Sequence, residues 1–96
     1  MEKYTLSILV ENSAGVLSRV VGLFTRRGFN IHSLSVGTTT DDKISRITIE
    51  VKGDVYMVEQ VTKQLSKIME VIKIKTLRDE ELVKRGYLKA QKQRVR

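Results

Sequence analysis

Two spacings of apolar residues alternate along this chain, and their order limits the folds that it can adopt. One is the two-residue period of a half-buried strand, and the other is the three- to four-residue period of an amphipathic helix. The expected segments are strand 3–10, helix 16–27, strand 29–36, strand 46–51, a helix from the residue after Asp54 to Ile68, and strand 72–77. This order predicts an α+β fold of the ferredoxin-like βαββαβ type, with both helices on one face of a four-stranded antiparallel sheet.

The first strand and the first helix carry the clearest patterns. Four apolar side chains alternate from Tyr4 to Val10, as in a strand with one buried face. Helical spacing starts at Val16 and is expected to end near Arg27, just before Gly28. A glycine suits the left-handed residue that ends many helices, and the two arginines before it complement the negative end of the helix dipole.

The second and third strands are expected to form a hairpin. Apolar residues change phase between Ile31 and Leu34, so an irregularity near His32 and Ser33 explains the pattern better than an unbroken strand. Turn-forming residues follow, and segment 46–51 then alternates cleanly. The hairpin therefore joins an irregular strand to a regular one.

Asp54 has the chemistry of an N-cap and precedes the second helix. The apolar stripe of that helix consists of Val58, Val61, Leu65 and Ile68. The last strand, 72–77, alternates again. If both helices cover one face of the sheet, the open face displays Thr5, Ser7, Leu9, Thr48, Lys73 and Lys75.

The segment after the last strand differs from the rest in charge. The chain has a formal net charge of +7, and residues 78–96 carry +4 of it, with seven Lys and Arg against three acidic residues. We expect one domain over residues 1–78. Residues 79–96 are interpreted as a basic C-terminal tail or as the start of a missing second domain.

Composition excludes several kinds of chemistry. The chain has no cysteine, so it has neither disulfides nor thiolate metal ligands, and one histidine, His32, cannot assemble a zinc site. No activated nucleophile or G-x-S-x-G elbow is present, and Asp41 and Asp42 are interpreted as turn formers. We therefore expect a non-catalytic protein without a bound metal. It has neither a signal-peptide pattern nor a membrane-spanning stretch, so we expect it in the cytoplasm.

The basic tail raises an alternative function, a ferredoxin-like nucleic-acid-binding module. The RNA recognition motif has the same order of elements, but it stacks bases on aromatic side chains of its central strands. The expected third strand, ISRITIEV, has no aromatic residue. We therefore expect no nucleic-acid partner, and the basic module is kept as the alternative.

The loop before the first helix has the pattern of an anion-binding site. Gly15, Val16 and Leu17 begin the helix, so their backbone N–H groups and the helix dipole favour a carboxylate there. A glycine also lets a ligand approach the backbone closely. To hold an amino acid, the site needs oxygen acceptors as well.

Two asparagines are candidates for this second role. Asn12 precedes the loop, and Asn30 with the main chain around Ile31 begins the second strand. Asn30 could contribute if a neighbouring chain closes the pocket. The spacing equally fits a structural interpretation, in which Asn12 caps the helix, Gly15 relieves crowding and Asn30 forms a turn.

The run LSILVENSAGVLSRVVGLFTRRGFNIHSLSVGTT, residues 6–39, resembles the opening of the regulatory subunits of acetohydroxyacid (acetolactate) synthase. Their hallmark is a strand, then E-N-x-x-G-x-L-S-R-V, then G-L-F-x-R-R-G-[FY]-N-I-x-S-L. The segments ISRITIEVKGD and EQVTKQLSKIMEVIKI are also similar to the family, so the resemblance covers about residues 3–77. These subunits carry an N-terminal ACT domain, whose ferredoxin-like fold agrees with the predicted order.

The resemblance implies a homodimer in which two ACT domains pair side by side into a continuous sheet. It further implies that a branched-chain amino acid, usually valine, binds at their interface. Asn12 and Asn30 would contact this effector through their side chains. Main-chain or wall contacts would come from Gly15, Val16, Leu17 and Ile31.

The same resemblance implies a role in the biosynthesis of valine, leucine and isoleucine. The family's small subunit activates a catalytic large subunit and confers feedback inhibition by valine. Thiamine diphosphate, magnesium and FAD belong to the large subunit, and none is expected on this chain. Many members carry a second domain, whereas this sequence ends at Arg96, so effector binding is better supported than full activation. A scaffold that assembles with the large subunit without an effector is a further alternative.

Overall fold

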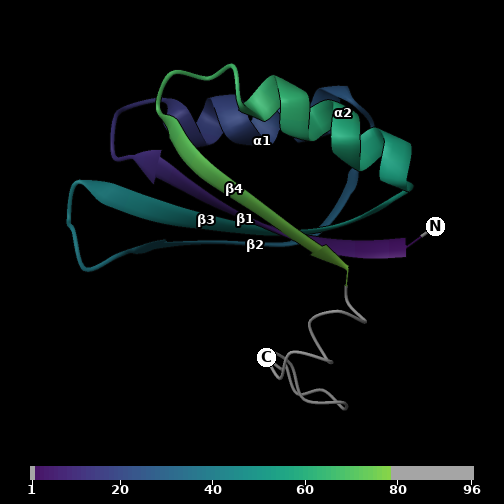
Figure 1. Ribbon diagram of the computed structural model, residues 1–96, viewed down its shortest axis with the longest axis horizontal. Coiled ribbons are helices and arrows are strands. Elements are labelled where there is room, and N and C mark those ends of the chain that lie inside the picture. Colours follow the sequence, from purple (N-terminus) through teal and green to yellow (C-terminus); the bar gives the residue numbers. More distant parts are fainter. Residues whose placement is uncertain (1, 79–96) are drawn as a thin grey trace, which may run out of the picture.

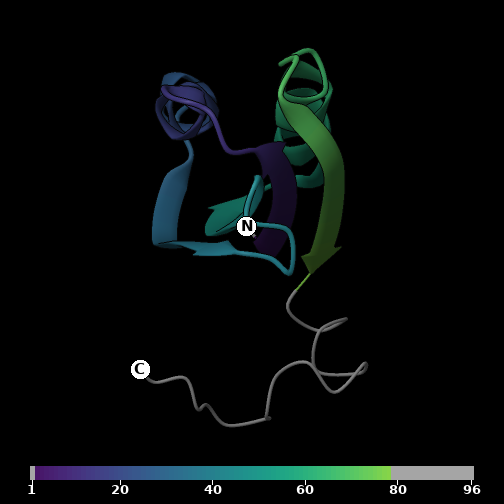
Figure 2. The same cartoon turned by 90° about the vertical axis from the view of Figure 1, so that its left-hand side faces the viewer.

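Six elements follow one another in the predicted order in the computed structural model, which describes residues 2–78. They are β1 (Glu2–Glu11), α1 (Val16–Arg26), β2 (Asn30–Thr38), β3 (Ile44–Gly53), α2 (Val55–Leu65) and β4 (Val71–Arg78). Both helices lie on one face of a four-stranded antiparallel sheet (Figure 1), and an end-on view shows them side by side (Figure 2). The predicted ferredoxin-like fold is confirmed. The tail predicted at 79–96 lies outside the described residues.

The strand order in the sheet is β2–β3–β1–β4, so β1 and β3 are central and β2 and β4 are edges. β1 pairs with β3 along its whole length, from Glu2 opposite Gly53 to Glu11 opposite Ile44. Because residues directly opposite each other share a face, this register places the apolar phases of both strands on the side of the helices.

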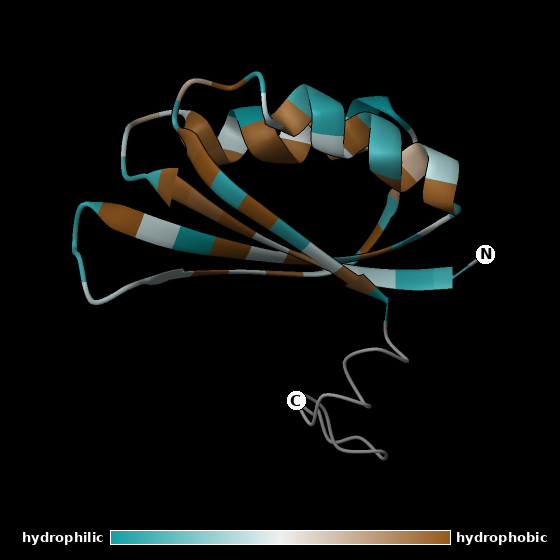
Figure 3. Ribbon diagram, viewed as in Figure 1, coloured by the Kyte–Doolittle hydropathy of each residue, from teal (hydrophilic) through white to brown (hydrophobic). Residues whose placement is uncertain are grey.

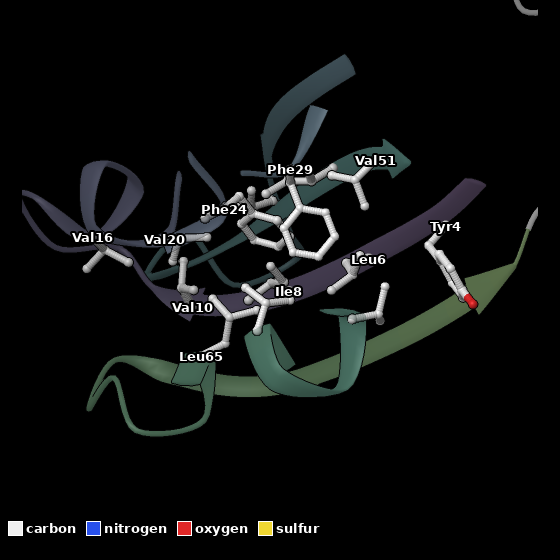
Figure 4. Packing of buried hydrophobic residues seen from close by; sticks show 14 residues of the cluster. Tyr4, Leu6, Ile8, Val10, Val16, Val20, Phe24, Phe29, Val51 and Leu65 are labelled. Atoms are coloured by element: carbon white, nitrogen blue, oxygen red, sulfur yellow. The ribbon is translucent and has the colours of Figure 1, made fainter. Parts of the chain in front are cut away.

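The core lies between this face and the two helices. Phe24 of α1 is fully buried and packs against Phe29, with ring centroids 5.4 Å apart (Figure 4). The helices turn their apolar stripes toward the sheet and their polar faces away from it (Figure 3). Burying each large apolar side chain contributes about 1.5–3 kcal/mol. The buried cluster comprises Tyr4, Leu6, Ile8, Val10, Val16, Val20, Phe24, Phe29, Ile47, Ile49, Val51, Val58, Val61 and Leu65.

Each edge strand contains one register shift. In β2 the shift falls between Ile31 and Ser33, so the predicted irregularity is confirmed, with His32 as the extra residue. In β4, Val10 pairs with Val71 and Leu9 with Lys73, which leaves Ile72 unpaired and half exposed. The regular alternation expected from residue 72 is therefore wrong at its first position, because a bulge there changes the phase.

The helix ends follow the chemistry of their flanking residues. Asp54 caps α2, because its carboxylate accepts a hydrogen bond of 2.8 Å from the Met57 N–H. After α1, Gly28 has a φ of +77°, and its N–H donates to the Thr25 carbonyl, as expected for a left-handed terminating residue. The stripe of α2 was expected to run to Ile68, but the helix ends at Leu65. Ile68 instead packs against the core from the following turn.

The face without helices carries the polar residues that the sequence predicts. Ser7 pairs with Thr48 on one side and Lys75 on the other, and Arg46 donates to the Ser7 hydroxyl at 3.0 Å. The register also places Leu77 on this face. None of the open-face residues of the four described strands is aromatic, so they lack the stacking platform of an RNA recognition motif.

Candidate functional site

The N-terminus of α1 differs from that of α2 in having no side-chain cap. Gly15 occupies the N-cap position with φ +83° and ψ −8°, and the first turn of α1 contains no acidic residue. A side chain on a left-handed residue is strained, so a glycine suits this backbone. The positive end of α1 is thus not neutralised by the protein's own side chains, whereas Asp54 supplies a carboxylate to α2.

The loop leaves room for a ligand at Gly15. A Cβ atom placed there would meet no atom within 4 Å. Val16 is 2% exposed and packs in the core, so its side chain cannot contact a ligand, and its N–H already donates a long hydrogen bond of 3.4 Å to the Ser13 carbonyl. Leu17 is 41% exposed and can provide an apolar wall.

Asn12 does not cap α1, so the interpretation of this residue as a helix cap is wrong. Its side-chain Nδ2 donates to the Asp42 carbonyl at 3.3 Å, and its backbone N–H donates to the Lys43 carbonyl at 2.8 Å. Asn12 therefore ties the loop to the turn between β2 and β3. Because the amide nitrogen faces a carbonyl, Oδ1 is left to accept a hydrogen bond, and no described residue donates one to it.

Glu70 holds the other side of the same loop, and the sequence analysis missed it. Its carbonyl accepts a hydrogen bond of 2.8 Å from the Glu11 N–H, just before the loop. Its carboxylate pairs with Arg19 of α1 at 3.0 Å, just after the loop. The hydrogen bond from Arg19, with one from the backbone of Glu70, holds the pKa of this carboxyl below its usual range. No local motif marks Glu70, because its contacts depend on how the turn before β4 meets β1.

The structure does not bring Asn30 to Asn12 within one chain. Asn30 is the first residue of β2 and pairs with Lys52, which pairs with Lys3. Asn12 follows Glu11, at the other end of β1, so roughly 26 Å of strand separates the two sites at about 3.3 Å per residue. Ile31 lies beside Asn30 and packs partly against the core. One small ligand cannot contact both asparagines of the same chain.

A cluster of metal ligands and a membrane-spanning helix are two other kinds of feature that the described residues could contain. No three His, Asp or Glu side chains between residues 2 and 78 gather closely enough to hold a metal ion. His32 is exposed at the bulge of β2. Neither helix in this range is long and apolar enough to cross a lipid bilayer.

Residues 6–73 match the family described as the AHAS small subunit-like ACT domain. The chain belongs to this family. This ACT domain is 62% identical over 72 residues to the probable acetolactate synthase small subunit of Archaeoglobus fulgidus. The matched residues cover 75% of this chain and 45% of that protein. It is 50% identical over 72 residues to the acetolactate synthase isozyme 3 small subunit of Escherichia coli. These residues cover 75% of this chain and 44% of the Escherichia coli protein.

A solved relative agrees with these matches. The crystal structure of the acetolactate synthase small subunit of Thermotoga maritima superimposes with a TM-score of 0.72 and 43% identity, over 79% of this chain and 47% of that one. The family and the ACT fold predicted from residues 6–39 are therefore confirmed. The chain spans about half the length of the relatives that it matches.

Proposed function

We propose that this ACT domain is the effector-binding part of a regulatory small subunit of acetolactate synthase. The observation that carries the proposal is the uncapped start of α1 at Gly15, inside the segment that matches the family. A ligand carboxylate would accept hydrogen bonds from the first-turn N–H groups of α1 and interact with its dipole. The exposed side chain of Leu17 would contact an aliphatic side chain, which favours valine, leucine or isoleucine over a polar amino acid.

Asn12 would bind the ligand's ammonium group. Its Nδ2 is already directed to the Asp42 carbonyl, so Oδ1 is oriented as an acceptor beside the loop. A donor at the carboxylate end and an acceptor at the ammonium end distinguish an α-amino acid from a simple carboxylic acid. Gly15, Val16 and Leu17 would contribute main-chain or wall contacts.

A second copy of the chain would supply Asn30 and Ile31. β2 is an edge strand, and on its helix-side face Leu34 and Val36 are 42% and 49% exposed although they pair with buried residues of β3. Antiparallel pairing of two β2 strands would cover this apolar edge and make one continuous sheet. It would also place the second copy's Asn30 beside Thr38, the end of β2 nearest the Asn12 loop.

The domain would act through a catalytic large subunit, which would bind thiamine diphosphate, magnesium and FAD. Binding of valine would favour a less active arrangement of the complex, because a ligand shifts an equilibrium toward the state that it binds more tightly. This role requires no catalytic group on the ACT domain. It provides feedback inhibition in the biosynthesis of branched-chain amino acids.

Thermal unfolding with added amino acids tests the effector site. Valine at 100 times its Kd should stabilise the wild-type chain by about 2.7 kcal/mol, and glycine at the same concentration should have little effect. Asn12→Ala should lose most of the valine-dependent shift, whereas Gln60→Ala on α2 should keep it. No shift with any branched-chain amino acid, or an equal shift in Asn12→Ala, would contradict the proposed site.

A further inference from the structure

A basic groove lies between the two helices, at the opposite end of α1 from the loop of residues 12–15. It has a volume of about 390 Å³ and is lined by Leu23, Arg26, Arg27 and Gln64. Leu23 and Arg26 come from α1, Arg27 follows that helix, and Gln64 comes from the last turn of α2. The groove thus combines an apolar side chain, an amide and two guanidinium groups.

Gly22 allows the Arg26 side chain to lie along the groove. A Cβ atom at Gly22 would come within 3.2 Å of Arg26 Nη1, closer than a typical contact. The guanidinium therefore turns back by one helical turn, toward the N-terminus of α1. Because Gly22 has no side chain, the Arg26 guanidinium can lie beside it.

Arg26 does not serve to cap α1. Main-chain N–H groups already satisfy the last carbonyls of the helix: Arg27 donates to Leu23, Gly28 to Thr25 and Phe29 to Phe24. These bonds are 3.0–3.2 Å long. The orientation of Arg26 toward Gly22 also directs its charge away from the negative end of α1, where a cation would be most stabilising.

The positive charges of this surface are not neutralised by their own domain. Within residues 2–78, no carboxylate makes an ion pair with Arg26 or Arg27. Lys63 and Lys67, which flank Gln64 in the sequence and are exposed, also make no ion pair in this range. A guanidinium group presents a planar set of donors that matches a carboxylate, so the groove is complementary to acidic side chains.

The groove would also stay accessible in the proposed dimer. Pairing through β2 uses the edge of the sheet, whereas the residues that line the groove belong to α1, the residue after it and α2. Both helices lie in the layer above the sheet (Figure 2). We infer that this groove docks an acidic segment of the catalytic large subunit, with its carboxylates on Arg26 and Arg27 and an apolar side chain on Leu23. The inference rests on the proposed function, since it takes the large subunit as the partner.

Charge reversal tests the groove in a binding titration with the cognate large subunit. Arg26→Glu combined with Arg27→Glu should raise the Kd about tenfold or more, because the reversed charges repel the acidic segment. Lys52→Glu combined with Lys73→Glu makes the same charge change on the open sheet face and should change the Kd less than about twofold. Wild-type affinity should fall with added salt.

The valine-dependent thermal shift of the arginine double variant is the control for folding and should be unchanged. Equal Kd values for wild type and the arginine variant, or equal weakening in both double variants, would overturn the groove as the docking site while leaving the effector proposal intact. Weakened binding to RNA with unchanged binding to the large subunit would also overturn it, in favour of a phosphate-binding surface. A wild-type chain that binds valine but no large subunit would overturn both the docking inference and the proposed partner.

Discussion

Two glycines with positive φ angles stand on either side of α1 and have different roles. Gly28, at φ +77°, ends the helix in the way that its position after two arginines predicts. Gly15, at φ +83°, begins the helix and leaves its N-terminus without a side-chain oxygen. The same conformational freedom therefore ends α1 at one terminus and leaves the other terminus without a side-chain cap.

Gly15→Ala should lower the free energy of unfolding by about 1–2 kcal/mol, because an L-residue is strained in the left-handed conformation. The added Cβ itself meets nothing, so strain rather than a clash is the cause. Gly37→Ala is the matched control: its Cβ also meets nothing, and its φ is not positive, so we expect a change within about 0.5 kcal/mol. Urea unfolding measures both variants, and equal values would contradict this account.

At the scale of elements, the loop of residues 12–15, part of the proposed effector site, is held between two turns that come from later in the chain. Asn12 binds the turn between β2 and β3, and Glu70 joins the turn before β4 to Glu11 and Arg19. These contacts fix both ends of the loop. A loop held in its binding conformation loses less entropy when a ligand binds, so this clamp should favour affinity.

Glu70→Gln should weaken valine binding and reduce stability in a pH-dependent way. Arg19 lowers the folded-state pKa of Glu70, so the stabilisation is fully present above the unfolded value of about 4.3 and is lost as the pH falls through the lowered folded value. The stability difference between wild type and Glu70→Gln should thus be constant near neutral pH and shrink in acid. Denaturant unfolding at several pH values measures it.

Glu59→Gln, on the exposed face of α2, provides the comparison for this experiment. Glu59 makes no ion pair within residues 2–78, so this variant should differ little from wild type in its free energy of unfolding. A pH-independent difference for Glu70→Gln would show that the Arg19 ion pair contributes nothing to stability. Unchanged valine affinity would show that the clamp does not prepare the loop for its ligand.

At the scale of the whole molecule, the sheet has two edges with different surfaces. β4 ends its regular pairing at the bulge of Ile72, whereas β2 carries Leu34 and Val36 on a face that the helices leave partly uncovered. An apolar edge strand readily pairs with another strand. One domain therefore lacks both the cover for β2 and the second half of the proposed effector site.

Val36→Glu should convert a dimer into a monomer, because it places a charge in the proposed interface at the edge of the sheet. The monomer should remain folded, since Val36 is 49% exposed in the single chain, but it should lose the valine-dependent stabilisation. Val55→Glu, at a 59% exposed position on α2, should stay dimeric and keep the response. Analytical ultracentrifugation and thermal melts with valine measure both properties. A dimeric Val36→Glu variant would contradict pairing through β2.

The sequence by itself determined the order and type of the elements and most of the core. Local spacing records which side of each segment is buried, so even the phase change at His32 was predictable. The family motif likewise indicated the loop at Gly15 as the candidate effector site, which stays a prediction. Both signals are carried by residues that are close together in the chain.

Only the tertiary structure decided how these segments meet. The partner of Asn12, the clamp at Glu70 and the bulge at Ile72 all depend on the register between strands far apart in the sequence. The separation of Asn12 from Asn30 depends on it as well, and it makes a second chain necessary for a shared ligand. Local periodicity contains no information about which residue of one strand faces which residue of another, because that choice is made by packing across the whole sheet.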